Sequence, residues 1–309
     1  IIAGGAYGKA TIDDVKPDRV LRELEEGKIV IVAGFQGLMP NGDVATLGRG
    51  GSDATAVALA GAMHADMCEI FTDVDGIYSA DPRHVKGCVK MKEITNTEML
   101  EMARLGAGVM QPRSVELGMK YHIPIHVRST FTDEEGTIIR EVCTMDGKNE
   151  AVRGVAQDAH AARIAVLGLR NIPGVAYMVF SALAEDNITV DMIVQSVRNS
   201  NDDKTDIIFT IEDTDLPDAK RVLEQMRDEG KLEEVIYDDD TAKVSVVGAG
   251  MLGTPGVAAR MFGALGRAGV NIDIVSTSEI SISCLILRKD LDKAVQAIHD
   301  EFFPAAKAE

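Results

Sequence analysis

Ile172-Pro-Gly-Val-Ala176 returns 82 residues later as Thr254-Pro-Gly-Val-Ala258. The two stretches then stay in register through apolar positions to an aspartate, which pairs Phe180, Leu183, Ile188, Val190 and Asp191 with Phe262, Leu265, Val270, Ile272 and Asp273. A repeat that keeps its spacing over this length indicates one supersecondary unit used twice. The residues before it contain no copy of the repeat, so the chain divides into a distinct first half and a duplicated second half.

Each copy of the repeat predicts the βαββαβ order of a ferredoxin-like unit. The first copy predicts helices at 175–185 and 216–228 and strands at 163–168, 188–198, 205–211 and near Val235. The second copy predicts helices at 255–268 and 290–302 and strands at 243–248, 270–276 and 281–287. It lacks a closing strand, so an interleaved arrangement in which the last strands complete the first unit stays open. We expect domains at 1–150, 151–240 and 241–309.

The first half alternates strands and helices. The apolar, β-branched run at 28–35 predicts a strand that is buried on both faces and is therefore parallel. Further strands are predicted at 67–72 and 123–128, and helices at 53–64, 95–105 and 113–121. This alternation indicates an α/β fold in which helices cover both faces of a mainly parallel sheet.

Composition narrows the class of partner. The 309 residues carry a formal charge of −17, which disfavours nucleic acid and anionic membrane as partners because both would be repelled. The four cysteines are scattered, as expected for reduced thiols in the cytoplasm, and no apolar run approaches the roughly 20 residues of a membrane span. The chain opens at Ile1 and enters a strand-like stretch at once, so we expect its true start to lie upstream.

Three segments of the first half carry candidate binding residues. Gly48-Arg49-Gly50-Gly51-Ser52-Asp53 precedes an alanine-rich helix, where glycine amides, the helix N-terminus and the Arg49 guanidinium can meet an anion. Segments 34–37 and 72–83 each follow a predicted strand, and ligands of open α/β sheets bind beyond the carboxyl ends of strands. We therefore expect the three segments on one rim. An ordinary tight turn with Ser52 as a helix cap is the alternative for the first.

One further glycine pattern is a weaker candidate. Gly248-Ala-Gly-Met-Leu-Gly253 follows a predicted strand, and Asp273 comes about 20 residues later, as in dinucleotide-binding loops. The first copy of the repeat lacks these glycines, and too few residues follow for a dinucleotide domain, so we do not favour this interpretation.

Four motifs together resemble the aspartokinase family: Val32-Ala-Gly-Phe-Gln-Gly37, Thr46-Leu-Gly-Arg-Gly-Gly-Ser-Asp53, Thr72-Asp-Val-Asp-Gly-Ile-Tyr-Ser-Ala-Asp-Pro-Arg83 and Arg113-Ser-Val-Glu116. The duplicated half, with Val190-Asp-Met-Ile-Val-Gln195 and Ser276-Thr-Ser-Glu-Ile280, is similar to that family's paired ACT regulatory domains. The resemblance runs nearly end to end. It implies a three-layer αβα amino-acid kinase domain, truncated here, that phosphorylates the side-chain carboxylate of L-aspartate with ATP, the first step of lysine, threonine and methionine biosynthesis.

The resemblance also assigns residues to the substrates. Carried over by position, the residues that would bind aspartate are Phe35, Arg49, Ser52 and Asp53. Those that would line ATP are Arg49, Gly50, Gly51, Ser52, Thr72, Asp73, Val74, Asp75, Gly76, Tyr78, Asp81 and Arg83. Mg²⁺ would arrive with ATP and bridge its phosphates, without a ligand from the protein.

Two features depart from the family pattern. The family opens on a Lys-Phe-Gly-Gly strand, whose lysine neutralises the transferred phosphate, and this motif is not among the 309 residues. Gly108 also stands where many relatives place a lysine that contacts the nucleotide. With both cations absent, we expect these 309 residues alone to bind ATP weakly and turn over little or not at all, although the intact protein is a kinase.

For the duplicated half, the resemblance implies feedback by lysine, threonine or both, at a pocket formed where two ACT units pair. The matching positions are Asn171, Pro173, Gly174, Val175, Ala176, Thr189, Val190, Asp191, Gln195, Val257, Ala258, Asn271, Ile272, Ser278 and Glu279. Asp191 and Glu279 can meet ammonium groups. Asn171 stands where relatives often have aspartate, which puts selectivity for lysine in doubt. Without the resemblance, the Pro-Gly turns would simply start helices.

Other functions stay open beside a regulated aspartate kinase. A regulatory subunit that binds amino acids without catalysis is the alternative, although residues 1–145 retain much of the substrate rim. A kinase of the same fold that acts on glutamate, acetylglutamate or a nucleotide is a third, which the ACT pair disfavours. ACT units usually pair across chains, so we expect a homodimer, with a separate regulatory subunit as a further partner.

Overall fold

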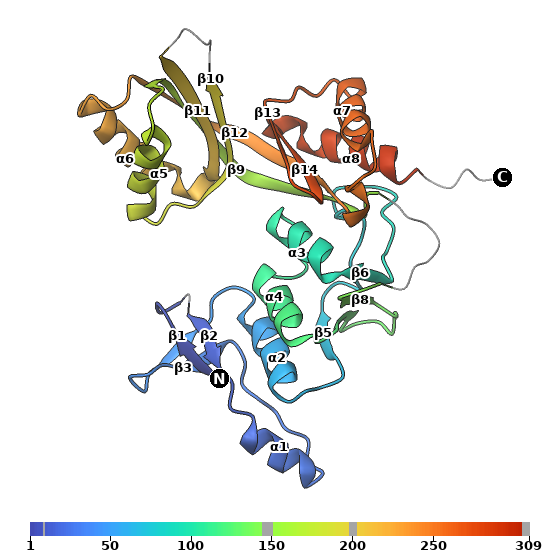
Figure 1. Ribbon diagram of the computed structural model, residues 1–309. Coiled ribbons are helices and arrows are strands. Elements are labelled where there is room, and N and C mark those ends of the chain that lie inside the picture. The colour runs from blue at the N-terminus through green and yellow to red at the C-terminus, as the bar shows by residue number, and fades with distance from the viewer. Residues whose placement is uncertain (9, 144–150, 198–202, 305–309) are drawn as a thin grey trace, which may run out of the picture. The chain divides into compact units, whose positions relative to one another are not determined.

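The computed structural model describes residues 1–8, 10–143, 151–197 and 203–304, and it divides the chain into two compact units (Figure 1). The first unit comprises Ile1–Ala156 with Val247–Pro255 and the C-terminal end, and the second comprises Gln157–Val246 with Gly256–Glu301. The boundary that we predict near residue 150 and the end of the strand predicted at 188–198 lie outside the described residues. No helix among the described residues is long and apolar enough to span a membrane.

The first unit begins with a small four-stranded sheet. Its strands are β1 (Ile2–Gly4), β2 (Thr11–Asp14), β3 (Gln36–Leu38) and β4 (Val44–Thr46), in the order β2-β1-β3-β4. Helix α1 (Asp18–Glu25) joins β2 to the segment before β3 and has no buried residue. The buried cluster at this sheet contains only four residues, three alanines and one leucine, namely Ala3, Ala10, Ala45 and Leu47.

A second four-stranded sheet holds the main core of this unit. It consists of β5 (Cys68–Thr72), β6 (Glu93–Thr95), β7 (Ile125–Ser129) and β8 (Thr137–Arg140), in the order β5-β7-β8-β6. Helices α2 (Gly51–Ala62), α3 (Asn96–Arg104) and α4 (Pro112–Tyr121) lie close to the positions predicted for them. A capping box starts α3, because the Thr95 hydroxyl accepts from the Glu98 amide while the Glu98 carboxylate accepts from the Thr95 amide.

The α/β class is confirmed, but two expectations for the first half are wrong. The sheets mix parallel pairs, such as β5 with β7, and antiparallel pairs, such as β7 with β8, instead of forming one mainly parallel sheet. Residues 28–34 form no strand, and the side chains of Ile29 and Ile31 are 96% and 94% exposed. A strand needs a hydrogen-bonded neighbour, and among the described residues no strand lies beside this segment.

The second unit contains a six-stranded sheet with the order β10-β11-β9-β12-β14-β13. In chain order its elements are β9 (Gly154–Arg170), α5 (Val175–Glu185), β10 (Val190–Val197), β11 (Lys204–Glu212), α6 (Leu216–Asp228), β12 (Glu234–Val247), α7 (Val257–Arg267), β13 (Ile274–Thr277), β14 (Ser281–Leu287) and α8 (Leu291–Phe302). The predicted helix at 216–228 and strand at 281–287 agree with these bounds.

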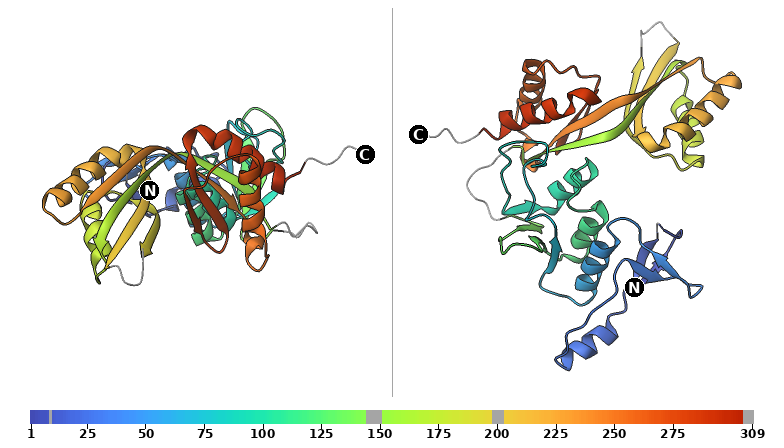
Figure 2. Two further views of the ribbon diagram at one scale, coloured as in Figure 1. Left: turned by 90° about the horizontal axis from the view of Figure 1, so that it is seen from above. Right: turned by 180° about the vertical axis from the view of Figure 1, so that it is seen from behind.

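The two copies of the repeat share the central strands of this sheet. Figure 2 shows β9 and β12 as long strands that run through both halves of the unit. Residues 161–170 of β9 pair with β11 of the first copy. The earlier residues of β9 have no partner in β11 and continue beside β12. The strands predicted near Val235 and at 243–248 are one strand, β12, and the predicted limit at residue 240 falls inside it. The two ferredoxin-like copies are thus interleaved through β9 and β12. The last strands, β13 and β14, lie on the β12 side, so the early part of β9, and not the last strands, completes a copy other than its own. The domain limits stay predictions.

The repeated Pro-Gly turns have the same local structure. Gly174 and Gly256 cap α5 and α7 and have a φ of 95° in both copies, with ψ of −6° and −5°. This left-handed conformation favours glycine. The repeat therefore reflects a backbone requirement at the start of each helix.

Candidate functional site

The loop before α2 packs tightly against the segment that follows residue 34. The Leu47 amide donates to the Phe35 carbonyl at 2.9 Å, and the Phe35 amide donates to the Thr55 hydroxyl at 3.2 Å. A Cβ atom at Gly51 would lie 2.9 Å from both Leu47 and the Phe35 ring. The structure thus brings together two of the three predicted rim segments, 34–37 and 48–53.

Phe35 and Gly50 both have left-handed backbone conformations, with φ of 67° and 70°. For a bulky residue such as phenylalanine this conformation is uncommon, and such strain often accompanies a ligand site. The Phe35 side chain is 44% exposed, so part of its ring is open to a ligand. Gly50 has a packing reason as well, because a Cβ there would lie 2.2 Å from the Gln111 side chain.

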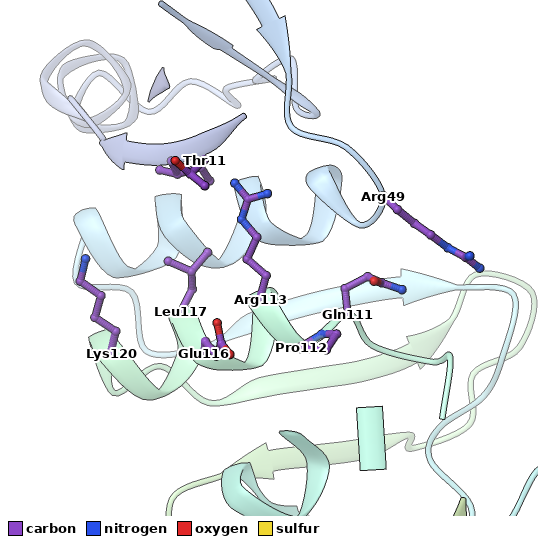
Figure 3. Close-up of a pocket in the computed structure, with 9 residues that line it drawn as sticks. Thr11, Arg49, Gln111, Pro112, Arg113, Glu116, Leu117 and Lys120 are labelled. Carbon is purple, nitrogen blue, oxygen red and sulfur yellow. The ribbon is translucent and has the colours of Figure 1, made fainter. Parts of the chain in front are cut away.

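Arg49 lines a cavity of about 590 Å³ whose other walls are β2, with Thr11, and helix α4 (Figure 3). Arg113 and Lys120 of α4 add positive charge to its wall. The Arg113 guanidinium donates to the carbonyls of Leu47 and Ala10 at 2.9 and 2.7 Å, so it braces the loop. Among the described residues, no hydrogen bond or ion pair engages the Arg49 guanidinium, which leaves it available for an anion.

Asp53 lies half-buried in the first turn of α2. Burial raises the pKa of its carboxyl group, and a 3.3 Å hydrogen bond from the Ser52 hydroxyl opposes this shift. The same carboxylate lies near Cys68 of β5, where burial, together with the charges of Asp53 and Glu69, raises the thiol pKa to about 11. A desolvated carboxylate favours a cationic partner such as an ammonium group.

Within the predicted nucleotide loop at 72–83, several side chains bind one another. The Arg83 guanidinium donates to both carboxylate oxygens of Asp81, at 2.7 to 3.2 Å, and this contact lowers the pKa of Asp81. The Thr72 hydroxyl donates to Asp73 at 3.1 Å. The Arg83 side chain is 82% exposed, so its guanidinium is still open to a ligand on its outer side.

Sequence reasoning missed two residues that fix this loop. The ammonium group of Lys90 lies 3.1 Å from Asp75 and 3.2 Å from Glu134, and the Tyr78 hydroxyl donates to the same Asp75 carboxylate. The buried Thr137 hydroxyl accepts from the Ile77 amide at 2.9 Å. No sequence signal pointed to either residue, because Lys90 lies outside the motif at 72–83 and Thr137 lies 60 residues from Ile77.

The expected effector positions lie mostly on the surface of the second unit. Asn171, Pro173, Gly174, Thr189, Asp191, Asn271, Ser278 and Glu279 are exposed, whereas Val175 and Val257 are buried in their helices. The side-chain amide of Gln195 donates to Thr205 at 3.3 Å. Met192 and Ile274 belong to one buried cluster, which places the segments ending at Asp191 and Ile272 close together.

Other expected pairings have no contact to support them. Among the described residues, no hydrogen bond or ion pair joins Arg49, Ser52 or Asp53 to Thr72, Asp73, Asp81 or Arg83, or joins the two Pro-Gly turns. The described residues also include no cluster of three or more side chains suited to hold a metal ion. The assignments of individual site residues therefore stay predictions.

Comparisons with known proteins agree with this architecture. The sequence model of the amino acid kinase family matches residues 3–129, and an ACT domain model matches 164–226 and 244–302. The aspartokinase of Mycolicibacterium smegmatis is 47% identical over 98% of this chain and 72% of its own length.

Among solved structures, the chain is likewise similar to aspartokinases. E. coli aspartokinase III in complex with aspartate and ADP matches 97% of this chain and 67% of its own, at 28% identity and a TM-score of 0.79. The same enzyme in complex with lysine and aspartate matches 93% of this chain and 63% of its own, at 29% identity and a TM-score of 0.71.

Proposed function

Because this chain belongs to the aspartokinase family, we propose that it transfers the γ-phosphoryl group of ATP to the side-chain carboxylate of L-aspartate, forming 4-phospho-L-aspartate. The end-to-end likeness to aspartokinases carries this proposal, since it covers both the substrate rim and the duplicated half. The solved relative with aspartate and ADP in one complex supports both substrates.

The loop before α2 suits the amino-acid substrate. Arg49 offers a planar guanidinium with no partner among the described residues, which suits bidentate binding of the α-carboxylate. The half-buried carboxylate of Asp53 suits the ammonium group, with the hydroxyl of Ser52 beside it. Phe35 would cover the substrate from the neighbouring segment.

The nucleotide would lie along 72–83 and the start of α2. The first amides of a helix have no partner within the helix and attract phosphate oxygens, and Gly50 and Gly51 place no side chain in their way. Arg83 keeps an exposed guanidinium for phosphate, and Mg²⁺ would travel with ATP and neutralise its charge. Phosphoryl transfer depends mainly on positioning and charge neutralisation, which these groups supply.

The duplicated half would bind an amino-acid effector. One solved relative is in complex with lysine. Asn171 stands where the resemblance expects an aspartate, so one negative charge that could hold a lysine side chain is absent. A neutral amino acid such as threonine, alone or with lysine, therefore fits these positions at least as well. We place the effector at the segments that begin β10 and β13.

The test is hydroxylamine trapping of the acyl phosphate made by the protein as the cell produces it, with aspartate, glutamate or acetylglutamate as acceptor. We expect hydroxamate with aspartate only, and expect Arg49→Met to lower kcat/KM for aspartate by at least about 100-fold, since it removes a charged bidentate contact. The matched control is Arg104→Met, which removes an exposed arginine that pairs with Glu116 at 2.7 Å.

Two outcomes would overturn the proposal. Hydroxamate that forms with another acceptor in preference to aspartate would assign a different kinase. Binding of lysine or threonine by calorimetry, without any acyl phosphate, would instead assign a regulatory subunit.

A further inference from the structure

The two long central strands of the second unit carry the same charge pattern. In β9, Asp158 is followed five residues later by Arg163, and in β12, Asp238 is followed five residues later by Lys243. Each cation contacts the aspartate of the other strand, since Arg163 lies 3.0 Å from Asp238 and Lys243 lies 3.9 Å from Asp158. The central pair of strands is thus related by an approximate two-fold symmetry.

Each cation also reaches one further aspartate, in the opposite copy of the repeat. Lys243, on the first strand of the second copy, forms an ion pair with Asp191 of the first copy. Arg163, on the first strand of the first copy, lies 3.6 Å from Asp273 of the second copy. Asp191 and Asp273 are equivalent residues of the repeat, so the two contacts are reciprocal.

The two cations differ in burial. The side chain of Lys243 is 5% exposed, and those of Arg163, Asp158, Asp238 and Asp273 are between 23% and 29% exposed. A buried ammonium group that lacks a partner is costly, whereas ion pairs of partly exposed groups are screened in part by solvent. The aspartates are therefore needed to pair Lys243, and each ion pair ties one effector segment to a central strand.

The aspartates lie on the segments where we place the effector. Asp191 stands at the start of β10, directly after Thr189 and Val190, and Asp273 directly follows Asn271 and Ile272. The side chain of Asp191 is 55% exposed, so it can accept from a ligand on one side while Lys243 holds the other. Each segment is thus bound to the central strand of the opposite copy.

We infer that Lys243 and Arg163 are positioning residues that couple the two effector segments of this chain, so that each copy of the repeat fixes the effector segment of the other. This inference rests on the proposed function for the identity of the effector. The contacts that carry it do not depend on a ligand. Occupancy of one segment would then change the affinity of the other through these reciprocal ion pairs.

The test combines hydrogen exchange with calorimetry on the intact protein. In Lys243→Met, we expect about tenfold faster exchange at the start of β10, in the first copy, and little change before β13. In Arg163→Met, we expect the reverse, with faster exchange before β13. Lys243→Arg keeps the positive charge and should restore protection. A residue that held only the copy of the repeat to which it belongs would not produce this crossed pattern.

Effector binding provides the second measurement. We expect Lys243→Met to weaken binding of lysine or threonine by about tenfold, as is usual when one member of a coupled pair is lost. The matched control is Lys204→Met, which removes a lysine of β11 that pairs with Glu233 at 2.8 Å on the surface of the same unit. This control should leave both the exchange pattern and the affinity unchanged.

The outcomes separate this inference from the proposed function. If the unmodified protein binds neither lysine nor threonine, the proposed effector function fails. The coupling between the two segments is then tested by the hydrogen-exchange pattern of the variants alone. If the unmodified protein binds an effector but each variant loosens only its own copy, or behaves like Lys204→Met, the coupling is refuted. If Lys243→Met does not fold, Arg163→Met and Lys243→Arg still decide the question.

Discussion

Lys90 joins two loops of the first unit, because its ammonium group lies 3.1 Å from the carboxylate of Asp75 and 3.2 Å from that of Glu134. Asp75 belongs to the segment expected to line ATP, and Glu134 lies in the loop between β7 and β8. Lys90 is itself 24% exposed at its side chain, so solvent screens these ion pairs only in part. Lys90 therefore ties the segment expected to line ATP to the loop between β7 and β8.

We therefore expect Lys90→Met to raise KM for ATP about three- to tenfold with a smaller change in kcat, because partly screened ion pairs contribute roughly 1 kcal/mol. Steady-state kinetics at varied ATP would measure this. Lys92→Met is the control, since Lys92 is exposed and close in sequence. Equal effects of the two substitutions would show that Lys90 does not position the loop.

Gly50 and Gly42 provide a matched pair for testing the loop before α2. Both have positive φ, 70° and 89°, but a Cβ at Gly50 would lie 2.2 Å from Gln111, whereas a Cβ at Gly42 would meet nothing within 4 Å. Gly42→Ala should cost about 1 kcal/mol of unfolding free energy for the backbone strain alone. Gly50→Ala should cost about 1–3 kcal/mol more because of overpacking. Denaturant unfolding would measure both, and equal losses would mean that Gln111 moves aside freely.

Local signals predicted much of the fold. The Ala-, Val- and Leu-rich composition of 53–64 and the helix cap near Thr95 placed α2 and α3 within a few residues. The register of the repeat predicted the elements of the second unit and showed that the second copy lacks a closing strand. An Asn41-Gly42 pair at the β3–β4 turn is a typical hairpin signal that could have revealed the first antiparallel pair. Residue patterns within one segment predicted that segment's helix or strand correctly, because they depend on the burial of that element alone.

Features that depend on distant partners could not be predicted in this way. The apolar run at 28–34 has the composition of a buried strand, but composition cannot show whether a neighbour pairs with it. Lys90, Thr137, Lys243 and Arg163 likewise depend on contacts between residues far apart in sequence. The repeat shows that Asp191 and Asp273 are equivalent positions, but only the folded sheet shows that Lys243 and Arg163 contact them.

Asp53 should make the protein less stable at neutral pH than an amide at the same position. Burial raises the pKa of Asp53 in the folded state, so the ionised carboxylate is disfavoured there relative to the unfolded chain. Asp53→Asn should therefore raise the unfolding temperature at pH 7. The gain should shrink as the pH falls through the raised pKa and vanish below about 3.9, the ordinary value for aspartate, where both states are protonated.

Thermal unfolding from pH 3 to 8 would measure this difference, and the same variant should lose activity with aspartate, because the amide cannot pair with an ammonium group. Ser52→Ala keeps the carboxylate but removes the hydroxyl whose hydrogen bond opposes the rise in the pKa of Asp53, so it should lower the unfolding temperature at pH 7 and strengthen its pH dependence. A gain in stability that does not depend on pH would attribute the effect to something other than the charge of Asp53.

Gly108 offers a test by gain of function. The resemblance expects a lysine that contacts the nucleotide at this position, and a Cβ there would meet nothing within 4 Å. Its φ is not positive, so a side chain would not strain the backbone.

Gly108→Lys should therefore fold normally and lower KM for ATP about three- to tenfold, the range expected for one additional charge-assisted hydrogen bond to a phosphate. Gly108→Met controls for the added chain length without the charge, and the difference between the two should shrink as salt is raised. If the lysine and methionine variants have the same KM for ATP at low salt, Gly108 does not face the nucleotide, and the position of 72–83 along the phosphates has to be revised.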